Sequence, residues 1–465
     1  MKLYSENEQY KLYQGNMLDM LEVIEPNSID SIICDPPYEL NFMNKGWDNS
    51  GIAFQKETWQ KCYEALKSGG YLLAFGGSRT FHRIACAIED AGFEIRDTIM
   101  WLYGSGFPKS QNIGKMYDKK MGNKREIIGE TKIGKTSLGD GSGWDTSQNM
   151  KDIKATGKLD ITKGNSQFEG WGSALKPSYE PIVVARKPFK GSLVDNVIEY
   201  GVGGINIDEC RVEYEKTTNP ATNPLYRQQN ADKYKQVQGG ELSNGAVSWT
   251  SGKNGVNEGG RFPANTILTY DETDFDEVCG GFPNTKGGNR HNTAIRQSDK
   301  NSGYGFNINT RNEFNDSGSA SRYFYCAKTS KRDRDEGLEG SEGHKVNDGR
   351  QTIIDNAFQR GETIRKNTHP TVKPTELMQY LIRLVSPNGA TILDPFNGSG
   401  STGKAVMYEN KERNKGYKYI GIELTEEYLP ITKARIEYVC NLIEEEKTQD
   451  KQTTIFDVGE NENNN

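Results

Sequence analysis

Residues 390–403 read Ala-Thr-Ile-Leu-Asp-Pro-Phe-Asn-Gly-Ser-Gly-Ser-Thr-Gly. The apolar run at 390–393 predicts a short buried strand, and Gly398, Gly400 and Gly403 predict a sharp turn into a helix. A second apolar run, at 419–422, ends at Glu423, 20 residues after Gly403. A strand, a glycine turn, a helix and an acidic residue at the next strand end predict one unit of a parallel α/β sheet that binds a nucleotide-like ligand.

This turn also shares features with the binding sites of two other ligands, nucleoside triphosphates and NAD. Gly398 to Lys404 also spells the phosphate-loop pattern GxxxxGK, but position 405 is Ala, which lacks the hydroxyl that would bind magnesium. Asp394 stands between the strand and the glycines, where a carboxylate would repel the pyrophosphate of NAD. The same carboxylate suits a ligand that carries an ammonium and a sulfonium group. The turn therefore favours S-adenosylmethionine over NAD or a nucleoside triphosphate.

A second run, Asp35-Pro36-Pro37-Tyr38, follows the apolar segment 28–34 and lies 359 residues (394 − 35) before Asp394. Two prolines fix the backbone and remove two N–H donors, so the turn presents only acceptors. An exocyclic amine on a heteroaromatic ring needs two acceptors and a stacking partner. The Asp35 carboxylate and the Pro36 carbonyl supply the acceptors, and Tyr38 supplies the ring. We expect this run and the glycine turn to converge in space.

Strand and helix signals alternate over residues 28–103 and again over 375–440. The first region contains helical spacing at 54–68 and 79–91 and apolar strands at 71–75 and 93–101. The second contains a helical face from 377 to 384, with Thr375 as its expected N-cap, and a final helix that begins near Thr425. This rhythm predicts a mostly parallel, Rossmann-like sheet with helices on both faces, and a ligand site at the carboxyl ends of the strands.

Together the two runs resemble the motifs of amino-directed DNA methyltransferases, which act on adenine N6 or cytosine N4. The order of catalytic run, insert and cofactor run resembles the β group of that family. The segment His369-Pro370-Thr371-Val372-Lys373-Pro374 resembles the one that precedes the cofactor motif in the family. The resemblance covers 1–103 and 367–440, with looser similarity at 176–212 and 261–330 to methylases of phages and prophages.

The resemblance implies a role for each matching residue. It implies that Asp35, Pro36, Pro37 and Tyr38 bind the target base. It implies a cofactor site for S-adenosylmethionine, in which Glu423 holds the ribose hydroxyls. Gly15-Asn16 stands where the family often has Gly-Asp, so Asn16 would make a weaker contact with the adenine of the cofactor. The cofactor residues implied in this way are Asn16, Lys373, Asp394, Phe396, Asn397, Gly398, Gly400 and Glu423.

Four regions are predicted: a catalytic half at 1–103, an insert at 104–366, a cofactor-binding half at 367–446 and a disordered acidic tail at 447–465. The insert is rich in Gly, Ser, Asn and Lys and predicts a large irregular region that recognises the DNA target. The whole chain carries a net charge of −6, but residues 101–190 hold 16 Lys and Arg against 9 Asp and Glu. Charge of this kind suits phosphate contact, although charge runs are usually only solvated faces.

Composition excludes several other classes of protein. Hydrophobic residues make up 34% of the chain, and no run is long enough to span a bilayer. Seven cysteines without a CxxC pair, and only four histidines, predict reduced thiols and no metal site. The start of the chain lacks a signal peptide pattern. We expect a soluble protein in the cytoplasm of a bacterial or phage-infected cell, with double-stranded DNA as partner, no membrane contact, and a homodimer as an open alternative.

The target remains open between several classes. The resemblance implies adenine N6, because Asp at the first motif position is usual for adenine and Ser for cytosine N4. Both rings carry a similar amine, so cytosine stays open. Methylation of RNA bases or of a protein glutamine also uses related Pro-Pro-Tyr turns, but the long insert favours DNA. A DNA-binding regulator without chemistry would not need an intact Asp35 run, and an NAD-dependent oxidoreductase would leave that run unexplained.

Overall fold

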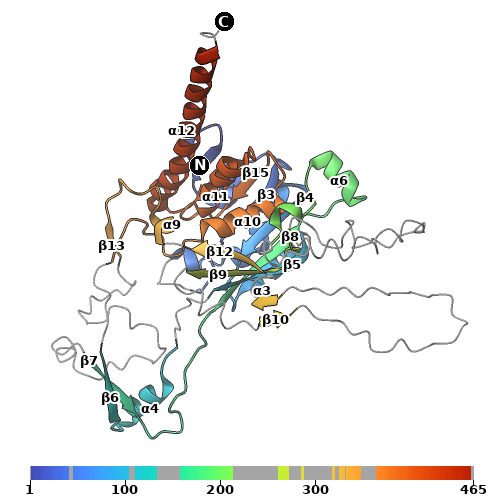
Figure 1. The fold of residues 1–465 in the computed structure, drawn as a ribbon. Coiled ribbons are helices and arrows are strands. Elements are labelled where there is room, and N and C mark those ends of the chain that lie inside the picture. Colours follow the sequence, from blue (N-terminus) through green and yellow to red (C-terminus); the bar gives the residue numbers. More distant parts are fainter. Residues whose placement is uncertain are drawn as a thin grey trace, which may run out of the picture.

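The fold is that of a computed structural model, which describes residues 2–40, 46–103, 110–132, 158–212, 260–271, 284–286, 317–319, 324–329, 331–346 and 363–461. Most of the long loops predicted within 104–366, and the last four residues, lie outside these ranges. Within them the chain forms one large sheet covered by helices, with smaller two-stranded pairs beside it (Figure 1).

The large sheet has ten strands and is mixed but mostly parallel. Antiparallel pairing is confined to β1 with β2 and to β8, which runs against both of its neighbours. In spatial order the strands are β1 (Lys2–Glu6), β2 (Tyr10–Gln14), β16 (Lys418–Glu423), β15 (Thr391–Asp394), β3 (Ile29–Cys34), β4 (Leu66–Phe75), β8 (Tyr179–Arg186), β5 (Glu94–Tyr103), β9 (Thr266–Asp271) and β12 (Tyr325–Thr329). The α/β fold class predicted from the sequence is confirmed.

Helices cover both faces of this sheet, as the alternating pattern predicted. One face carries α1 (Met17–Leu21), α2 (Lys56–Ala65) and α3 (Phe81–Asp90), and the other carries α10 (Thr375–Val385), α11 (Ser401–Arg413) and the start of α12 (Leu429–Asn461). Because successive side chains of a strand point to opposite faces, β3 sends Ile33 to the second face and Ile32 to the first. Both are fully buried, which explains why β3 reads as a continuous apolar run.

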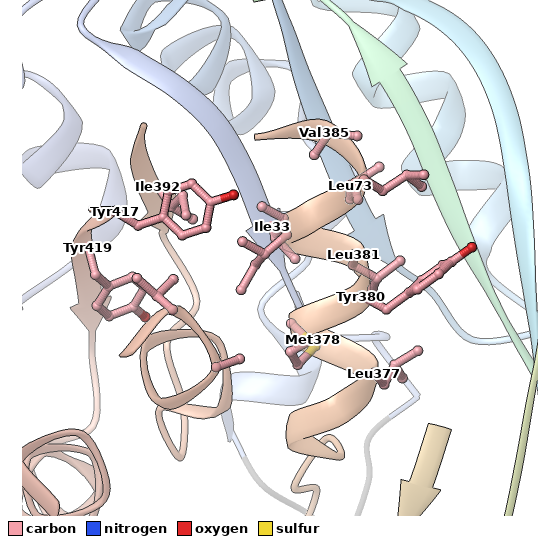
Figure 2. Close-up of a cluster of buried hydrophobic side chains, with 14 of the residues drawn as sticks. Ile33, Leu73, Leu377, Met378, Tyr380, Leu381, Val385, Ile392, Tyr417 and Tyr419 are labelled. Atoms are coloured by element: carbon pink, nitrogen blue, oxygen red, sulfur yellow. The ribbon is translucent and has the colours of Figure 1, made fainter. Parts of the chain in front are cut away.

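Helix α10 supplies much of the core beneath the site. Figure 2 shows Met378 and Leu381 of this helix beside Ile33 of β3, with Leu73 of β4 above them. The helix begins one residue earlier than expected: Pro374 occupies the N-cap, and Thr375, the expected cap, is the first helical residue. Asp333 accepts hydrogen bonds from both the Thr375 backbone N–H (2.9 Å) and its hydroxyl (2.5 Å), so the cap comes from a distant side chain.

The predicted insert is not separate from the sheet. Three of the ten strands, β8, β9 and β12, come from residues 104–366, and β8 lies between β4 and β5. The remaining described helices and strands of this region lie outside the large sheet: α4 (Ile113–Met121), β6 (Glu126–Lys132), β7 (Lys158–Lys163), α6 (Leu193–Tyr200), β10 (Asn284–Lys286), β11 (Ser317–Ser319), α9 (Lys331–Asp335), β13 (His344–Val346) and β14 (Thr363–Arg365). Short 3₁₀ turns lie at Gly46–Asn49, Ile52–Phe54, Asp208–Cys210 and Glu426–Tyr428.

The predicted disordered tail needs correction. Helix α12 continues to Asn461, so residues 447–461 are helical (Figure 1). The polar composition of this stretch suggested disorder, but it continues a helix whose first turns are anchored by buried Ile436 and Val439. Propagating an existing helix is cheaper than nucleating one. No helix in the described part of the chain has the length and apolar character needed to cross a membrane.

Candidate active site

One cavity contains both sequence runs. Strands β15 and β3 are parallel neighbours, with Ile392 beside Ser31 and Leu393 beside Ile32, so Asp394 and Asp35 emerge at the same sheet edge. A cavity of about 1360 Å³ opens there. The expected convergence across 359 residues (394 − 35) therefore occurs. The predicted site residues that line this cavity are Asn16, Asp35, Pro36, Pro37, Tyr38, Lys373, Asp394, Phe396, Asn397, Gly398 and Glu423.

Asp394 ties the end of β15 to the start of α11. Its carboxylate accepts hydrogen bonds from the Thr402 hydroxyl (2.6 Å) and from the Phe396 backbone N–H (3.0 Å). Burial raises the pKa of Asp394 to about 7, despite these bonds and with a contribution from the nearby carboxylate of Asp35. A buried carboxyl that forms no ion pair with any described residue is suited to a positively charged ligand.

Asn397 serves the fold of the turn through its side chain. Its Oδ1 accepts a hydrogen bond from the Tyr419 hydroxyl (2.7 Å), and its Nδ2 donates to the Thr432 hydroxyl (2.9 Å). The side chain is buried, and its polar atoms are used within the protein. Phe396, next to it, lines the cavity and packs against Trp59 with ring centroids 6.2 Å apart.

The glycines have distinct structural reasons. Gly398 has φ +53°, and a Cβ there would lie 2.9 Å from Nε2 of His369. Gly400 has φ +73°, and a Cβ there would lie 2.8 Å from the Thr432 side chain. Both need the left-handed backbone region that glycine adopts without strain. Gly400 is the one predicted site residue that does not line the cavity; it shapes the turn and lets α12 approach.

Glu423 closes the same loop from the end of β16. Its Oε2 accepts a hydrogen bond from the Gly398 backbone N–H (2.6 Å), and its Oε1 accepts one from the Thr425 backbone N–H (2.7 Å). Burial raises the pKa of Glu423 to about 7. Each oxygen retains lone-pair capacity, so the carboxylate can position the glycine loop and still accept hydroxyl donors from a ligand.

Asn16 caps a helix at the rim of the cavity. Its Oδ1 accepts a hydrogen bond from the Leu18 backbone N–H (3.0 Å) and so forms the N-cap of α1. The preceding Gly15 donates its backbone N–H to the carbonyl of Glu423 (3.0 Å), which joins this rim to the strand that carries the acidic residue. Asn and Asp both accept well at an N-cap, so Asn16 is a suitable cap for this helix.

The Asp35 run lies over a buried ion cluster. Oδ2 of Asp35 contacts Nζ of Lys373 at 2.7 Å, whereas Oδ1 is buried and has no hydrogen-bond partner among the described residues. The Tyr38 hydroxyl donates to Oε2 of Glu180 (2.7 Å) and accepts from Lys373 (3.2 Å). Burial alone would lower the pKa of Lys373, but the carboxylates of Asp35 and Glu180 outweigh it and raise that pKa. The lysine is therefore charged.

Sequence reasoning missed Glu180. The role of Lys373 in the cofactor site stays a prediction: Lys373 lines the cavity and contacts Asp35, Tyr38 and Glu180. Glu180 is the second residue of β8, within the predicted insert, and no local pattern links it to residue 38 or 373. The one available signal is Glu180-Pro181 at the start of an apolar strand, where an acidic residue stands at a strand end. In the described part of the chain, no group of three or more His, Cys, Asp or Glu side chains could hold a metal ion.

Comparison with known proteins places these features in context. The sequence model of the DNA methylase family matches residues 29–434. The Type II methyltransferase M2.LlaDCHI of Lactococcus lactis subsp. cremoris is 26% identical over 239 residues, which are 44% of this chain and 82% of that protein. The DNA adenine methyltransferase YhdJ of Escherichia coli K12 is 36% identical over 78 residues, which are 17% of this chain and 24% of that protein. A structure of the cytosine-N4-specific PvuII DNA methyltransferase aligns at 11% identity with a TM-score of 0.38, over 94% of this chain and 92% of that one.

Proposed function

Since the chain belongs to the family of N6- and N4-directed DNA methylases, we propose that it methylates N6 of adenine in double-stranded DNA with S-adenosylmethionine as methyl donor. The single observation that carries the proposal is the orphaned Oδ1 of Asp35, a buried acceptor at the cavity wall. A buried acceptor without a donor is costly, and an incoming N–H would remove that cost. The Pro36 carbonyl is the second acceptor for the same amine.

The residues at the other end of the cavity fit the methyl donor. Asp394 and Glu423 offer two buried carboxyls for a cationic, hydroxyl-bearing ligand, and Phe396 offers an apolar wall. A Cβ at Gly398 would collide with His369, so glycine lets the His369 side chain pack against this loop. When bound, S-adenosylmethionine supplies a methyl group on a sulfonium, and the electron pair of the broken C–S bond goes to the sulfur.

Asp35 would do most of the chemical work of this chain. An exocyclic amine is a poor nucleophile because its lone pair is conjugated into the ring. Hydrogen bonds from its N–H groups to Asp35 Oδ1 and to the Pro36 carbonyl favour a tetrahedral nitrogen whose lone pair can form the new N–C bond. The nitrogen becomes cationic as that bond forms, and the carboxylate stabilises it and takes the departing proton. Orientation of the two reactants supplies much of the remaining rate.

The adenine must leave the DNA stack to enter this cavity. Tyr38 lies at the cavity wall, and its hydroxyl is fixed by Glu180 and Lys373, so its ring is held in one orientation. A fixed aromatic ring is a suitable stacking surface for an extruded base. Adenine is favoured over cytosine by the Asp that begins the motif and by the likeness to the DNA adenine methyltransferase YhdJ.

We infer that DNA contact involves a small module of residues 110–132 and 158–175, which we call the α4 module. Figure 1 shows α4, β6 and β7 grouped away from the large sheet. The module has its own interior: Arg125 bonds to Oε1 of Glu169 at 2.7 Å, and Phe168 packs between Tyr117 and Trp171. It contains eight Lys and Arg against five Asp and Glu, and one of those cations is internal.

The base of the α4 module reaches the cavity. Gln111, Ser173 and Leu175 are among the residues that line it, and the chain continues from there to Glu180. A basic module beside the pocket for a flipped base can hold the surrounding phosphates. Lys119→Gln with Lys120→Gln, both exposed in α4, should weaken DNA binding and reduce its salt slope by about 0.9 per lost phosphate contact. Lys433→Gln in α12 is the matched control, and equal binding by both variants would remove the module from the interface.

The test of the function uses labelled S-adenosylmethionine and unmethylated DNA. We expect label in DNA, and mass spectrometry of the digested nucleosides should find N6-methyladenine. Product at cytosine N4 would keep the enzyme class and reject adenine; label confined to RNA or protein would reject DNA as substrate. Asp35→Ala should abolish transfer while cofactor binding persists. Sequencing of DNA from cells that express the protein would give the target site, and light scattering would decide between a monomer and a homodimer.

A further inference from the structure

Asp35, the proposed acceptor for the target amine, belongs to a cluster of three charged side chains with Lys373 and Glu180. Nζ of Lys373 lies 2.7 Å from Oδ2 of Asp35 and 3.3 Å from Oε2 of Glu180. The Lys373 side chain is only 8% exposed. Its ammonium also lies over the ring of Phe75 at 4.9 Å and that of Trp101 at 5.9 Å from the centroids. Little water can screen these charges, so each of them is felt by the others.

The sum of these charges matters for the reaction. Asp35 with Lys373 alone is neutral, and a neutral pair does little for a nitrogen that becomes cationic. Glu180 adds a second carboxylate, so the three groups together carry −1. Glu180 also accepts the Tyr38 hydroxyl hydrogen bond (2.7 Å) with the same oxygen, and Tyr103 donates to its other oxygen at 3.4 Å. The carboxylate is thus held in place from two sides.

We propose that Glu180 is a positioning residue of the methyl transfer, which offsets the charge of Lys373 so that Asp35 acts on the amine as an uncompensated anion. The inference rests on the proposed function and concerns the same site. It adds no step to the reaction: the proton of the amine still leaves through Asp35. Lys373 occupies Oδ2 of Asp35, and Oδ1 is left without a partner among the described residues.

The first test separates charge from shape at position 180. Glu180→Gln keeps the size and an acceptor for Tyr38 but removes the charge, and we expect kcat to fall by about 10²-fold, the size of effect seen when one electrostatic contact to a transition state is lost. KM for DNA and Kd for S-adenosylmethionine should stay within about threefold. Glu180→Asp keeps the charge and should retain more kcat than the Gln variant. Glu209→Gln, which breaks a carboxylate–lysine pair (2.6 Å) away from the cavity, is the matched control.

The second test restores the net charge of −1 at the cluster of Asp35, Lys373 and Glu180. Lys373→Met combined with Glu180→Gln leaves Asp35 as the single charge, so we expect kcat above that of Glu180→Gln and within about tenfold of the wild type. If Glu180→Gln alone does not fold, the double variant carries the test, since it also removes the buried cation of Lys373. Wild-type kcat in Glu180→Gln, greater loss in Glu180→Asp, or no recovery in the double variant would each overturn the inference. Failure of the wild type to methylate DNA would instead overturn the proposed function.

Discussion

Lowering the pH from 8 to 6 should weaken the binding of S-adenosylmethionine. Burial raises the pKa values of both Asp394 and Glu423 to about 7, and both carboxyls line the cavity. A cationic ligand with hydroxyl donors binds their ionised forms. A group with this pKa is about 90% ionised at pH 8 and about 10% at pH 6, so Kd should rise about tenfold for each carboxyl that must ionise. Binding should release protons near pH 7.

The effect of these two carboxyls on the stability of the ligand-free protein should be the opposite: it should increase as the pH falls. The folded-state pKa values lie above the usual values of 3.8 for Asp and 4.5 for Glu. Between about pH 4 and pH 7 the folded protein binds more protons at these carboxyls than the unfolded chain does. These two groups therefore lower the free energy of unfolding as the pH rises through that window. The stabilisation that the ligand adds should grow over the same range.

Fluorescence or calorimetric titration at constant ionic strength would measure this effect. Trp59 packs against Phe396 at the cavity wall, with ring centroids 6.2 Å apart, and gives an intrinsic signal. His369 also lines the cavity, but burial lowers its pKa to about 3, so it does not titrate between pH 6 and 8. S-adenosylhomocysteine, which lacks the sulfonium charge, should show a shallower slope. Equal Kd values for S-adenosylmethionine at pH 6 and 8 would refute the reasoning.

Three substitutions test the turn, the rim and the core. Gly398→Ala should lower cofactor affinity at least tenfold, since it adds about 1–2 kcal/mol of backbone strain to a steric clash; Gly389→Ala, with φ +76° and open space, is the control for strain alone. Asn16→Ala should cost about 1 kcal/mol in urea unfolding through the lost cap, and a large loss of cofactor affinity would show that its side chain does more. Glu409→Ala should destabilise the fold by about 3–5 kcal/mol, because it removes the carboxylate whose Oε1 lies 2.6 Å from Nη2 of the buried Arg383. An unchanged denaturation midpoint would contradict this.

The local parts of the site could be predicted because their signals are short. Strand, turn and helix follow one another within residues 390–413, and the glycines and Glu423 act across that same unit. The Asp35 run could be predicted as well, since its two prolines leave a turn that presents only hydrogen-bond acceptors. The proximity of the Asp35 run and the glycine turn could also be predicted, because parallel strands present their carboxyl ends at one sheet edge. Composition misled at the tail, where α12 continues, and within residues 104–366, which supply three strands of the large sheet.

The contacts that tune the site could not be predicted. Glu180 reaches Tyr38 because β8 enters the sheet between β4 and β5, and a strand pairing of this kind depends on the whole sheet. Lys373 lies on Asp35 although 338 residues (373 − 35) separate them. The helical cap at Thr375 comes from Asp333 for the same reason. None of these contacts produces a motif with a recognisable residue spacing in the sequence.

By itself, then, the sequence determined the α/β unit, the glycine turn with Glu423, and the acceptor turn at Asp35, since these depend on backbone geometry within a few residues. The tertiary structure alone decided the charge state around Asp35 and the occupancy of its two oxygens. Charge and burial depend on which distant groups share a low-dielectric space, and that is set by sheet order and packing. Oδ1 of Asp35, on which the proposed chemistry depends, has no partner among the described residues, while Oδ2 is held by Lys373, which also contacts Glu180.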